Sequence, residues 1–176
     1  MDALQPYILP LKGLGAGNHT FTFVVDNDFF AAFPDSPVEK AAVQLELALD
    51  KRPNLLVLDF SFSGWVEEKC DRCLAQIQLP VEGENQLLVK FGEAEEDNDD
   101  EDVVYIPAET SVWSVAQFAY EYILLGVPMI KMCEDRSTST DCDEEMLSYL
   151  ENKNSADEQA HNPLRDALKN WKQGEN

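Results

Sequence analysis

Basic residues are scarce in this chain of 176 residues, which contains 13 Lys and Arg against 34 Asp and Glu. The formal net charge at pH 7 is therefore -21. Nucleic-acid affinity depends mainly on Lys and Arg neutralising phosphates, so direct binding of RNA or DNA is disfavoured, as is docking on an anionic membrane. A basic protein or a cation is the more natural partner.

Long apolar runs, export patterns and catalytic motifs are also missing. No apolar stretch reaches the roughly 20 residues that span a bilayer, and no basic segment precedes an apolar one at the N-terminus. We therefore expect a cytoplasmic protein. The two histidines are His19, in an alternating segment, and His161, in a polar stretch, and neither has the surroundings of a general base. No phosphate-binding loop or nucleophile elbow occurs, so we expect no enzyme.

Apolar residues are nevertheless plentiful enough for a core. Hydrophobic residues make up 44% of the chain and aromatic residues 10%, which excludes wholesale disorder. The length suits one domain, which we place at residues 1–150. Residues 151–176 are predicted to form a polar linker followed by a short helix.

The first half of the chain alternates apolar and polar residues, which is typical of strands exposed on one face. We predict strands over residues 19–25, 42–50 and 55–65, and the turn at Pro53 makes the last two an antiparallel hairpin. Further strands are expected at 76–80, 86–91 and 103–106, with a short helix within 26–33. The expected buried side chains of the hairpin are Val43, Leu45, Leu47, Leu49, Leu56, Leu58, Phe60 and Phe62.

The pattern changes to helical spacing over residues 111–126. Thr110 or Ser111 is available as an N-cap, and Gly126 and Pro128 favour an end there. Glu121 is expected at the solvent edge. Shorter helices are predicted over 143–152 and 162–172. The expected apolar face is Val112, Val115, Ala116, Ala119, Tyr122 and Ile123. The predicted class is α+β: a mostly antiparallel sheet in the first 106 or so residues, packed by this main helix and short C-terminal helices.

A dense block of acids separates the two halves. Its eight carboxylates are Glu93, Glu95, Glu96, Asp97, Asp99, Asp100, Glu101 and Asp102. Such a block repels itself and does not bury, so residues 93–102 are predicted to form a mobile loop. Two interpretations remain open, a solubilising loop and a contact surface for a basic partner.

Four cysteines form the most specific chemical pattern. Cys70 and Cys73 make a C-x-x-C pair, and Cys133 and Cys142 follow some sixty residues later. A second pair can complete the tetrahedral coordination of Zn²⁺ by thiolates, although the later spacing is longer than in an ordinary second knuckle. Three interpretations stay open: a four-cysteine structural zinc site, a partial site, and unliganded thiols.

Several stretches together resemble one known family. They are "SGWVEEKCDRCLAQIQLPV", the acidic block leading to a helix that ends "EYILLGVPM", and the tail "CDEEMLSYLEN…NPLRDALKNW". The chain resembles the YceD-like proteins, the bacterial large ribosomal RNA subunit accumulation family. The positions that match the family pattern are Cys70, Arg72, Cys73, Leu74, Glu121, Leu125 and Pro128. The ending "NPLRDALKNW" is similar to that of Bacteroidetes-type members, with Asn162, Pro163, Leu164 and Arg165 in place of Asp-Pro-Arg-Trp.

The sequence departs from this family pattern near Cys133, where related members commonly have His. Asp143, Glu144, Glu145 and Met146 also replace the Asn-Pro-Glu-Met that follows Cys142 in those members. A Cys/His exchange is one that a zinc site tolerates, because both residues ligate zinc.

The resemblance implies a role in the accumulation of large-subunit ribosomal RNA without catalysis. With a net charge of -21, we expect indirect action through a basic ribosomal protein or assembly factor. Two alternatives remain: a stand-alone zinc-binding interaction module unrelated to ribosomal RNA, and a metal-dependent nuclease.

Overall fold

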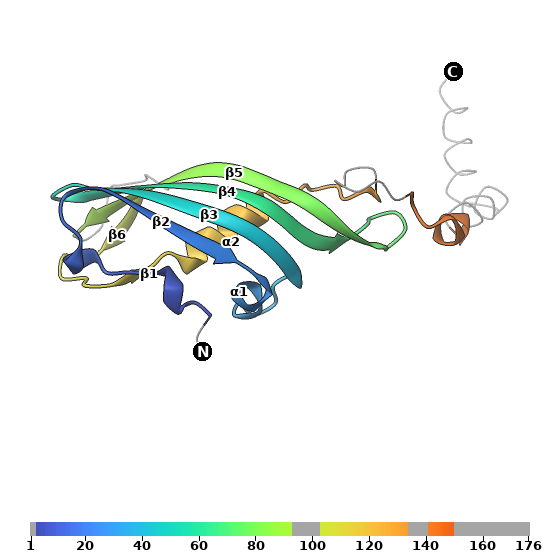
Figure 1. Ribbon diagram of the computed structural model, residues 1–176, viewed down its shortest axis with the longest axis horizontal. Helices are drawn as coiled ribbons and strands as arrows, with labels where there is room; N and C mark the ends of the chain where they lie inside the picture. Colours follow the sequence, from blue (N-terminus) through green and yellow to red (C-terminus); the bar gives the residue numbers. More distant parts are fainter. Residues whose placement is uncertain (1–2, 93–102, 134–140, 150–176) are drawn as a thin grey trace, which may run out of the picture.

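The structure is a computed structural model that describes residues 3–92, 103–133 and 141–149 (Figure 1). A five-stranded sheet has the order β2-β3-β4-β5-β6, and β1 pairs separately with β7. The predicted α+β class is confirmed. The elements are η1 (Gln5–Tyr7), β1 (Ile8–Leu9), η2 (Leu11–Gly13), β2 (Gly17–Val25), α1 (Asn27–Ala31), β3 (Lys40–Lys51), β4 (Leu55–Lys69), β5 (Gln76–Phe91), β6 (Val103–Ile106), β7 (Trp113–Ser114) and α2 (Ala116–Leu125).

The predicted hairpin of β3 and β4 is confirmed. The two strands pair antiparallel from Lys40 with Glu67 to Lys51 with Leu56, and their alternate side chains are buried. All eight side chains that the alternation assigned to the core are at most 4% exposed. A period of two places these residues on one face of the sheet, so the apolar half of each strand builds the core.

β5 is one long strand, and the prediction of separate strands at 76–80 and 86–91 was wrong. Polar residues in the middle of β5 are typical of a turn, but Glu82 and Glu84 occupy the exposed face while the buried alternation continues on both sides. Gly83 faces inward, and a Cβ there would lie 2.6 Å from Cζ of Phe62. The glycine therefore leaves room for a core ring rather than marking a turn.

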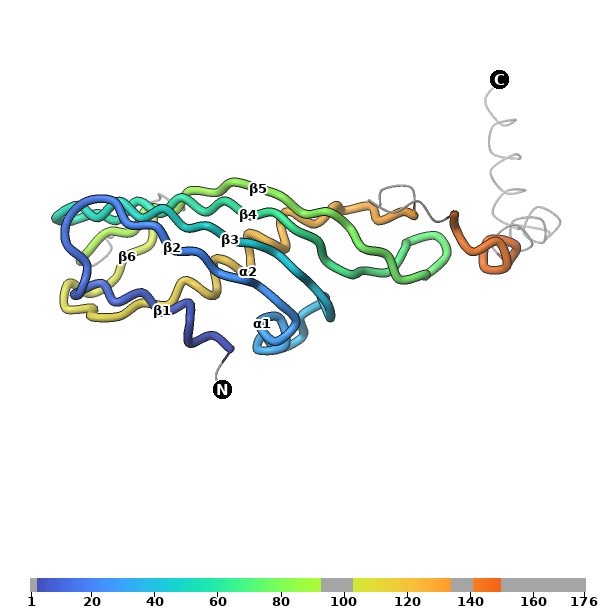
Figure 2. Tube along the Cα trace, in the orientation of Figure 1, coloured from blue at the N-terminus to red at the C-terminus, as the bar shows by residue number. Residues whose placement is uncertain are grey.

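A second glycine permits the close pairing of β3 with β4. Gly64 pairs with Val43. A Cβ at Gly64 would lie 2.2 Å from the carbonyl oxygen of Ala42 and 2.6 Å from the Cα of Val43, closer than any other residue type allows. The long strands of the sheet curve along their length (Figure 2).

The helices and the N-terminal segment pack on one face of the sheet (Figure 1). Phe60 on β4 meets Tyr122 on α2 edge-on, with ring centroids 5.1 Å apart. The short helix predicted within residues 26–33 is confirmed as α1. Asp26 caps it by accepting hydrogen bonds from the backbone N–H groups of residues 28 and 29. An aromatic contact therefore holds α2 on the sheet, and the rings of Phe30 on α1 and Tyr120 on α2, 5.9 Å apart, join the two helices.

The main helix begins later than predicted. Neither Thr110 nor Ser111 is its N-cap, because α2 starts at Ala116 with Val115 at the cap position. Residues 113–114 instead pair with Ile8–Leu9 as β7 with β1, so a tertiary strand pairing overrides helix propensity there. The assignment of Val112 to the apolar face was also wrong, since this side chain is 58% exposed.

Other features of the helix are confirmed. Gly126 is the C-cap of α2, and Val115, Ala116, Ala119 and Ile123 are buried. Glu121 is exposed and accepts a hydrogen bond from Gln117. Residues 144–149 are helical, as part of the helix predicted over 143–152. Across the described ranges, no helix is long and apolar enough to cross a membrane.

Several predictions concern residues outside the described ranges. They are the mobile acidic loop at 93–102, the helix over 162–172 and the polar linker after residue 150. The boundary at residue 150 also remains a prediction.

We predict that Phe60→Ala lowers the free energy of unfolding by about 3–5 kcal/mol, because it leaves a cavity between β4 and α2. Phe60 is 1% exposed. The neighbouring Ser61 is exposed on the opposite face, so Ser61→Ala is the matched control and should shift stability by less than about 0.5 kcal/mol. Urea unfolding followed by circular dichroism measures both, and equal effects would contradict the assigned faces.

Candidate metal centre

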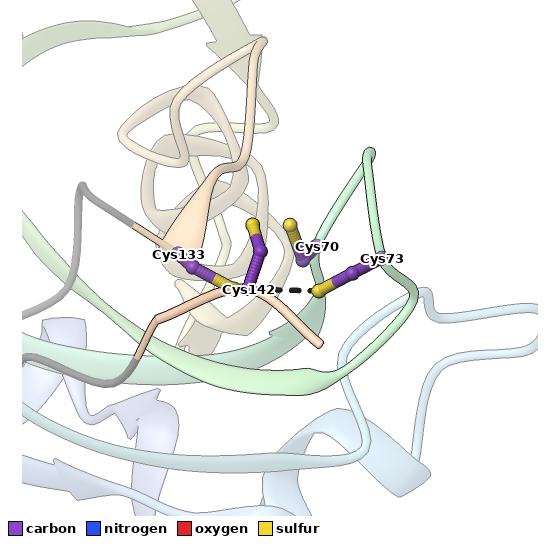
Figure 3. A group of neighbouring side chains, drawn as sticks. All are labelled: Cys70, Cys73, Cys133 and Cys142. Carbon is purple, nitrogen blue, oxygen red and sulfur yellow. Dashed lines mark hydrogen bonds between the residues drawn. The ribbon is translucent and has the colours of Figure 1, made fainter. Parts of the chain in front are cut away.

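The structure brings all four cysteines together, although two of them lie some sixty residues from the others. Cys70 and Cys73 lie in the turn between β4 and β5, and Cys133 and Cys142 follow α2. Figure 3 shows the four side chains pointing into one common space. Their Sγ atoms all lie within 4.8 Å of one another, and those of Cys73 and Cys133 are 3.5 Å apart.

The β4–β5 turn has a backbone shape that directs both of its thiols to the same side. The N–H of Leu74 donates to the carbonyl of Cys70 at 2.9 Å, and the N–H of Cys70 donates to the carbonyl of Ala75 at 2.8 Å. Leu74 adopts φ 61°, in the left-handed region that favours glycine. The turn is therefore tight, and one non-glycine residue bears backbone strain in it.

Hydrogen bonds join this turn to the segment after α2. The N–H of Asp71 donates to the carbonyl of Lys131 at 2.8 Å, and the N–H of Lys131 donates to Oδ2 of Asp71 at 2.7 Å. The Lys131 ammonium also pairs with Glu68 at 2.9 Å, and both side chains are partly buried. Cys133 is thus held beside the turn by contacts that need no metal ion.

The surroundings of the thiols favour the thiolate at Cys70 and Cys73. Burial alone would raise the pKa of Cys70, but backbone N–H groups of Cys73 and Arg72, with the neighbouring thiols, lower it to about 6. The backbone N–H groups of Ala75 and Asp143 lower the pKa of Cys73. Burial raises the pKa of Cys142. Backbone donors thus stabilise negative sulfur on the C-x-x-C side of the cluster.

The donor set and its spacing are compatible with zinc. A tetrahedral zinc ion with Zn–S bonds near 2.3 Å separates its sulfurs by about 3.8 Å. This is close to the 3.5 Å between Cys73 and Cys133 and below the 4.8 Å within which all four sulfurs lie. The cysteines are free thiols, far from the S–S distance of about 2.05 Å in a disulfide. Four sulfur ligands in this arrangement are typical of zinc or iron–sulfur centres.

His19, the one histidine within the described ranges, lies far from this cluster. His19 accepts or donates a hydrogen bond with the carbonyl of Gly15 at 2.9 Å. His19 on β2 is in register with Leu49 on β3, and Leu49 is in register with Leu58 on β4. Leu58 lies about 40 Å along the extended chain from Cys70. Among described His, Cys, Asp and Glu residues, the cysteine cluster alone could hold a metal ion.

The sequence did not indicate Asp71 or Lys131 as supporting residues of the cluster. Nothing in the spacing of the chain points to a pairing across some sixty residues, since both are ordinary surface residue types. The position of Asp71 inside the C-x-x-C turn was the one available hint. The predicted partner-binding carboxylates, from Glu93 to Asp102, lie outside the described residues.

Comparison with known proteins assigns the chain to a family. The sequence model of the family described as "Large ribosomal RNA subunit accumulation protein YceD" matches residues 58–172. The chain belongs to this family. The matched region of this YceD family member includes β5, β6, α2, most of β4 and all four cysteines. No curated protein and no solved structure matches the chain.

The family description concerns the accumulation of large-subunit ribosomal RNA and names no reaction. It therefore indicates the process in which the chain takes part. The resemblance drawn from the residues is confirmed at the level of the family.

We predict that Leu74→Gly raises the free energy of unfolding by about 1 kcal/mol, because glycine adopts a positive φ without the steric cost. Leu74 is 59% exposed, so little packing is lost. Val112→Gly is the matched control, since Val112 is 58% exposed without a positive φ, and it should not stabilise the protein. Thermal and urea unfolding measure both. A lower midpoint for Leu74→Gly would contradict the assigned strain.

Proposed function

We propose that this protein is a non-enzymatic ribosome-biogenesis factor that is needed for large-subunit ribosomal RNA to accumulate, and that it acts through a basic protein partner. The family match over residues 58–172 carries the proposal. The partner is a basic ribosomal protein or assembly factor, which the protein holds until ribosomal RNA replaces it.

The charge of the chain supports an indirect action on RNA. A net charge of -21 repels a phosphate backbone and attracts basic proteins over long range. Ribosomal proteins must neutralise RNA phosphates, so they carry the opposite charge to this chain. Capture of such a protein would be fast and sensitive to salt.

The four cysteines serve in this proposal as a structural zinc centre. Cys70 and Cys73 would bind the ion from the β4–β5 turn, and Cys133 and Cys142 from the segment after α2. The support is their convergence within 4.8 Å and the burial of three of the four side chains. Four protein ligands leave no open coordination position for a substrate, which suits structure rather than catalysis.

Depletion of the protein from cells should lower the ratio of large-subunit to small-subunit ribosomal RNA. The reason is that unassembled large-subunit RNA is exposed to degradation when its protein partner is not delivered. Quantitative electrophoresis of total RNA measures the ratio, and re-expression of the wild-type chain is the control. An unchanged ratio after verified depletion would contradict the proposed function.

The purified protein should contain about one zinc ion per chain, because four thiolates complete one tetrahedral site. Cys73→Ser and Cys133→Ser should each lose most of the metal and lower the unfolding midpoint. Leu74→Gly, in the same turn but without a ligand, is the control and should retain it. Elemental analysis and native mass spectrometry give the stoichiometry. A folded wild-type chain without metal, purified from zinc-containing medium under reducing conditions, would contradict the zinc centre.

A further inference from the structure

The face of the sheet opposite the helices is covered by none of the described elements (Figure 1). The outward residues of β3, β4 and β5 are exposed in regular alternation. They lie side by side in rows that the strand register fixes. Among the described elements, none packs on this face of the sheet.

The rows define a feature that we call the acidic trough. Its floor is the outward face of β4, with the small side chains of Ser61 and Ser63 in the middle. Asp59 lies at one end of the floor, and the partly exposed Trp65 lies at the other. Its walls are the outward residues of β3 and β5. The wall residues are Ala42, Gln44, Glu46 and Ala48 on β3, and Pro80, Glu82, Glu84 and Gln86 on β5.

The surface is hollowed along this line. One depression of about 410 Å³ is lined by residues that include Glu46, Ser61 and Glu84. A second, of about 460 Å³, is lined by residues that include Ser63 and Glu82, and it shares Ser61 and Glu84 with the first. The two depressions therefore adjoin each other along β4, and together we call them the groove.

The charge in the groove is of one sign. The trough contains no Lys or Arg. Within the described part of the chain, no ion pair or hydrogen bond is recorded for the carboxylates of Glu46, Glu82 and Glu84. Asp59 accepts one hydrogen bond, from Gln86 at 2.6 Å. The carboxylates of Glu46, Glu82 and Glu84 thus keep their full capacity to bind cationic groups.

The spacing of these carboxylates does not suit a single metal ion. Glu46 and Glu84 are both in register with Ser61 on the strand between them, so their backbones are about 10 Å apart. Calcium requires its oxygen ligands within about 2.6 Å. In the described ranges, the acids do not converge into a group that could hold an ion.

We propose that the acidic trough binds an extended, Arg-rich segment of a basic protein that lies along β4. The inference rests on the proposed function and names the surface that its basic partner uses. Charge complementarity selects the occupant, because every charged residue of the groove is acidic and the groove lies on a chain with a net charge of -21.

The geometry of an extended chain matches that of the trough. Alternate side chains of an extended segment project to the same side at intervals of about 7 Å. Glu82 and Glu84 have the same two-residue spacing along β5, so two successive basic residues would each meet one carboxylate. An Arg at the end of the groove would lie on the ring of Trp65, an arrangement that favours Arg over Lys.

The test measures binding of a fluorescent peptide that alternates Arg with Thr to the full-length chain, by anisotropy at low and at near-physiological salt. The trough variant is Glu46→Gln, Glu82→Gln and Glu84→Gln combined. The matched control is Asp35→Asn, Glu39→Gln and Glu109→Gln combined, which removes the same charge from exposed residues outside the trough.

The trough variant should bind the peptide roughly tenfold more weakly, because three exposed ion pairs are lost, and the control variant should differ from wild type by less than about twofold. Trp65→Thr should weaken binding of the Arg peptide more than that of the corresponding Lys peptide. In amide spectra of the wild-type chain, the peptide should shift the signals of residues 59–65 more than those of α2. Equal losses in the two triple variants would overturn the proposal, because only overall charge would then matter.

A fourth variant separates this proposal from the proposed function. It replaces the eight acids of residues 93–102 with Gln and Asn. If only that variant loses the peptide, the trough is overturned while a basic partner for the acidic block stands. If the wild-type chain binds no peptide at low salt, the trough is again overturned. The role in ribosomal RNA accumulation is judged separately by the depletion experiment.

Discussion

The strict alternation of side chains along β4 is the constraint on which the rest of the structure depends. β4 pairs with β3 on one edge and β5 on the other for most of its length, so each of its residues is committed to one face. Leu58, Phe60 and Phe62 form the core under the helices, while Asp59, Ser61 and Ser63 form the bare face. A slip of one residue in the register would exchange the core and the acidic trough, so burial and charge are specified by the same pairing.

Strand length explains why the cysteine cluster lies where it does. β4 has 15 residues and α2 has 10, so the strand extends about 50 Å and the helix about 15 Å. The helix layer therefore cannot cover the whole sheet. At the far end of the β4–β5 hairpin, the buried Cys70, Cys73 and Cys133 continue the core, with the Asp71–Lys131 hydrogen bonds beside them. Buried thiols and the hydrogen bonds between the Asp71 turn and Lys131 take the place of helix packing at this end.

Features that follow from local periodicity were predictable from the sequence. Features that depend on contacts with distant segments of the chain were not. The buried residues of β3 and β4 and the C-cap Gly126 were predictable because each depends on a repeat of two or on local turn chemistry. The continuity of β5 was not, since Gly83 is required by the ring of Phe62 on another strand. The late start of α2 depends on pairing of Trp113 with Leu9. The four cysteines were predicted as a set, whereas their supporting contacts across some sixty residues have no local pattern.

The parallel pairing of β5 with β6 has a consequence for how the chain tolerates changes in length. Leu88 pairs with Val103, and the N–H of Gly92 donates to the carbonyl of Ile106 at 2.9 Å. The chain therefore leaves the sheet from β5 and re-enters it on the neighbouring edge strand β6, and both points are anchored by strand pairing. Doubling the length of such a connection costs only about 0.6 kcal/mol in closure entropy. The junction between β5 and β6 is thus a natural insertion point for an affinity tag or a reporter domain that leaves the core pairing intact.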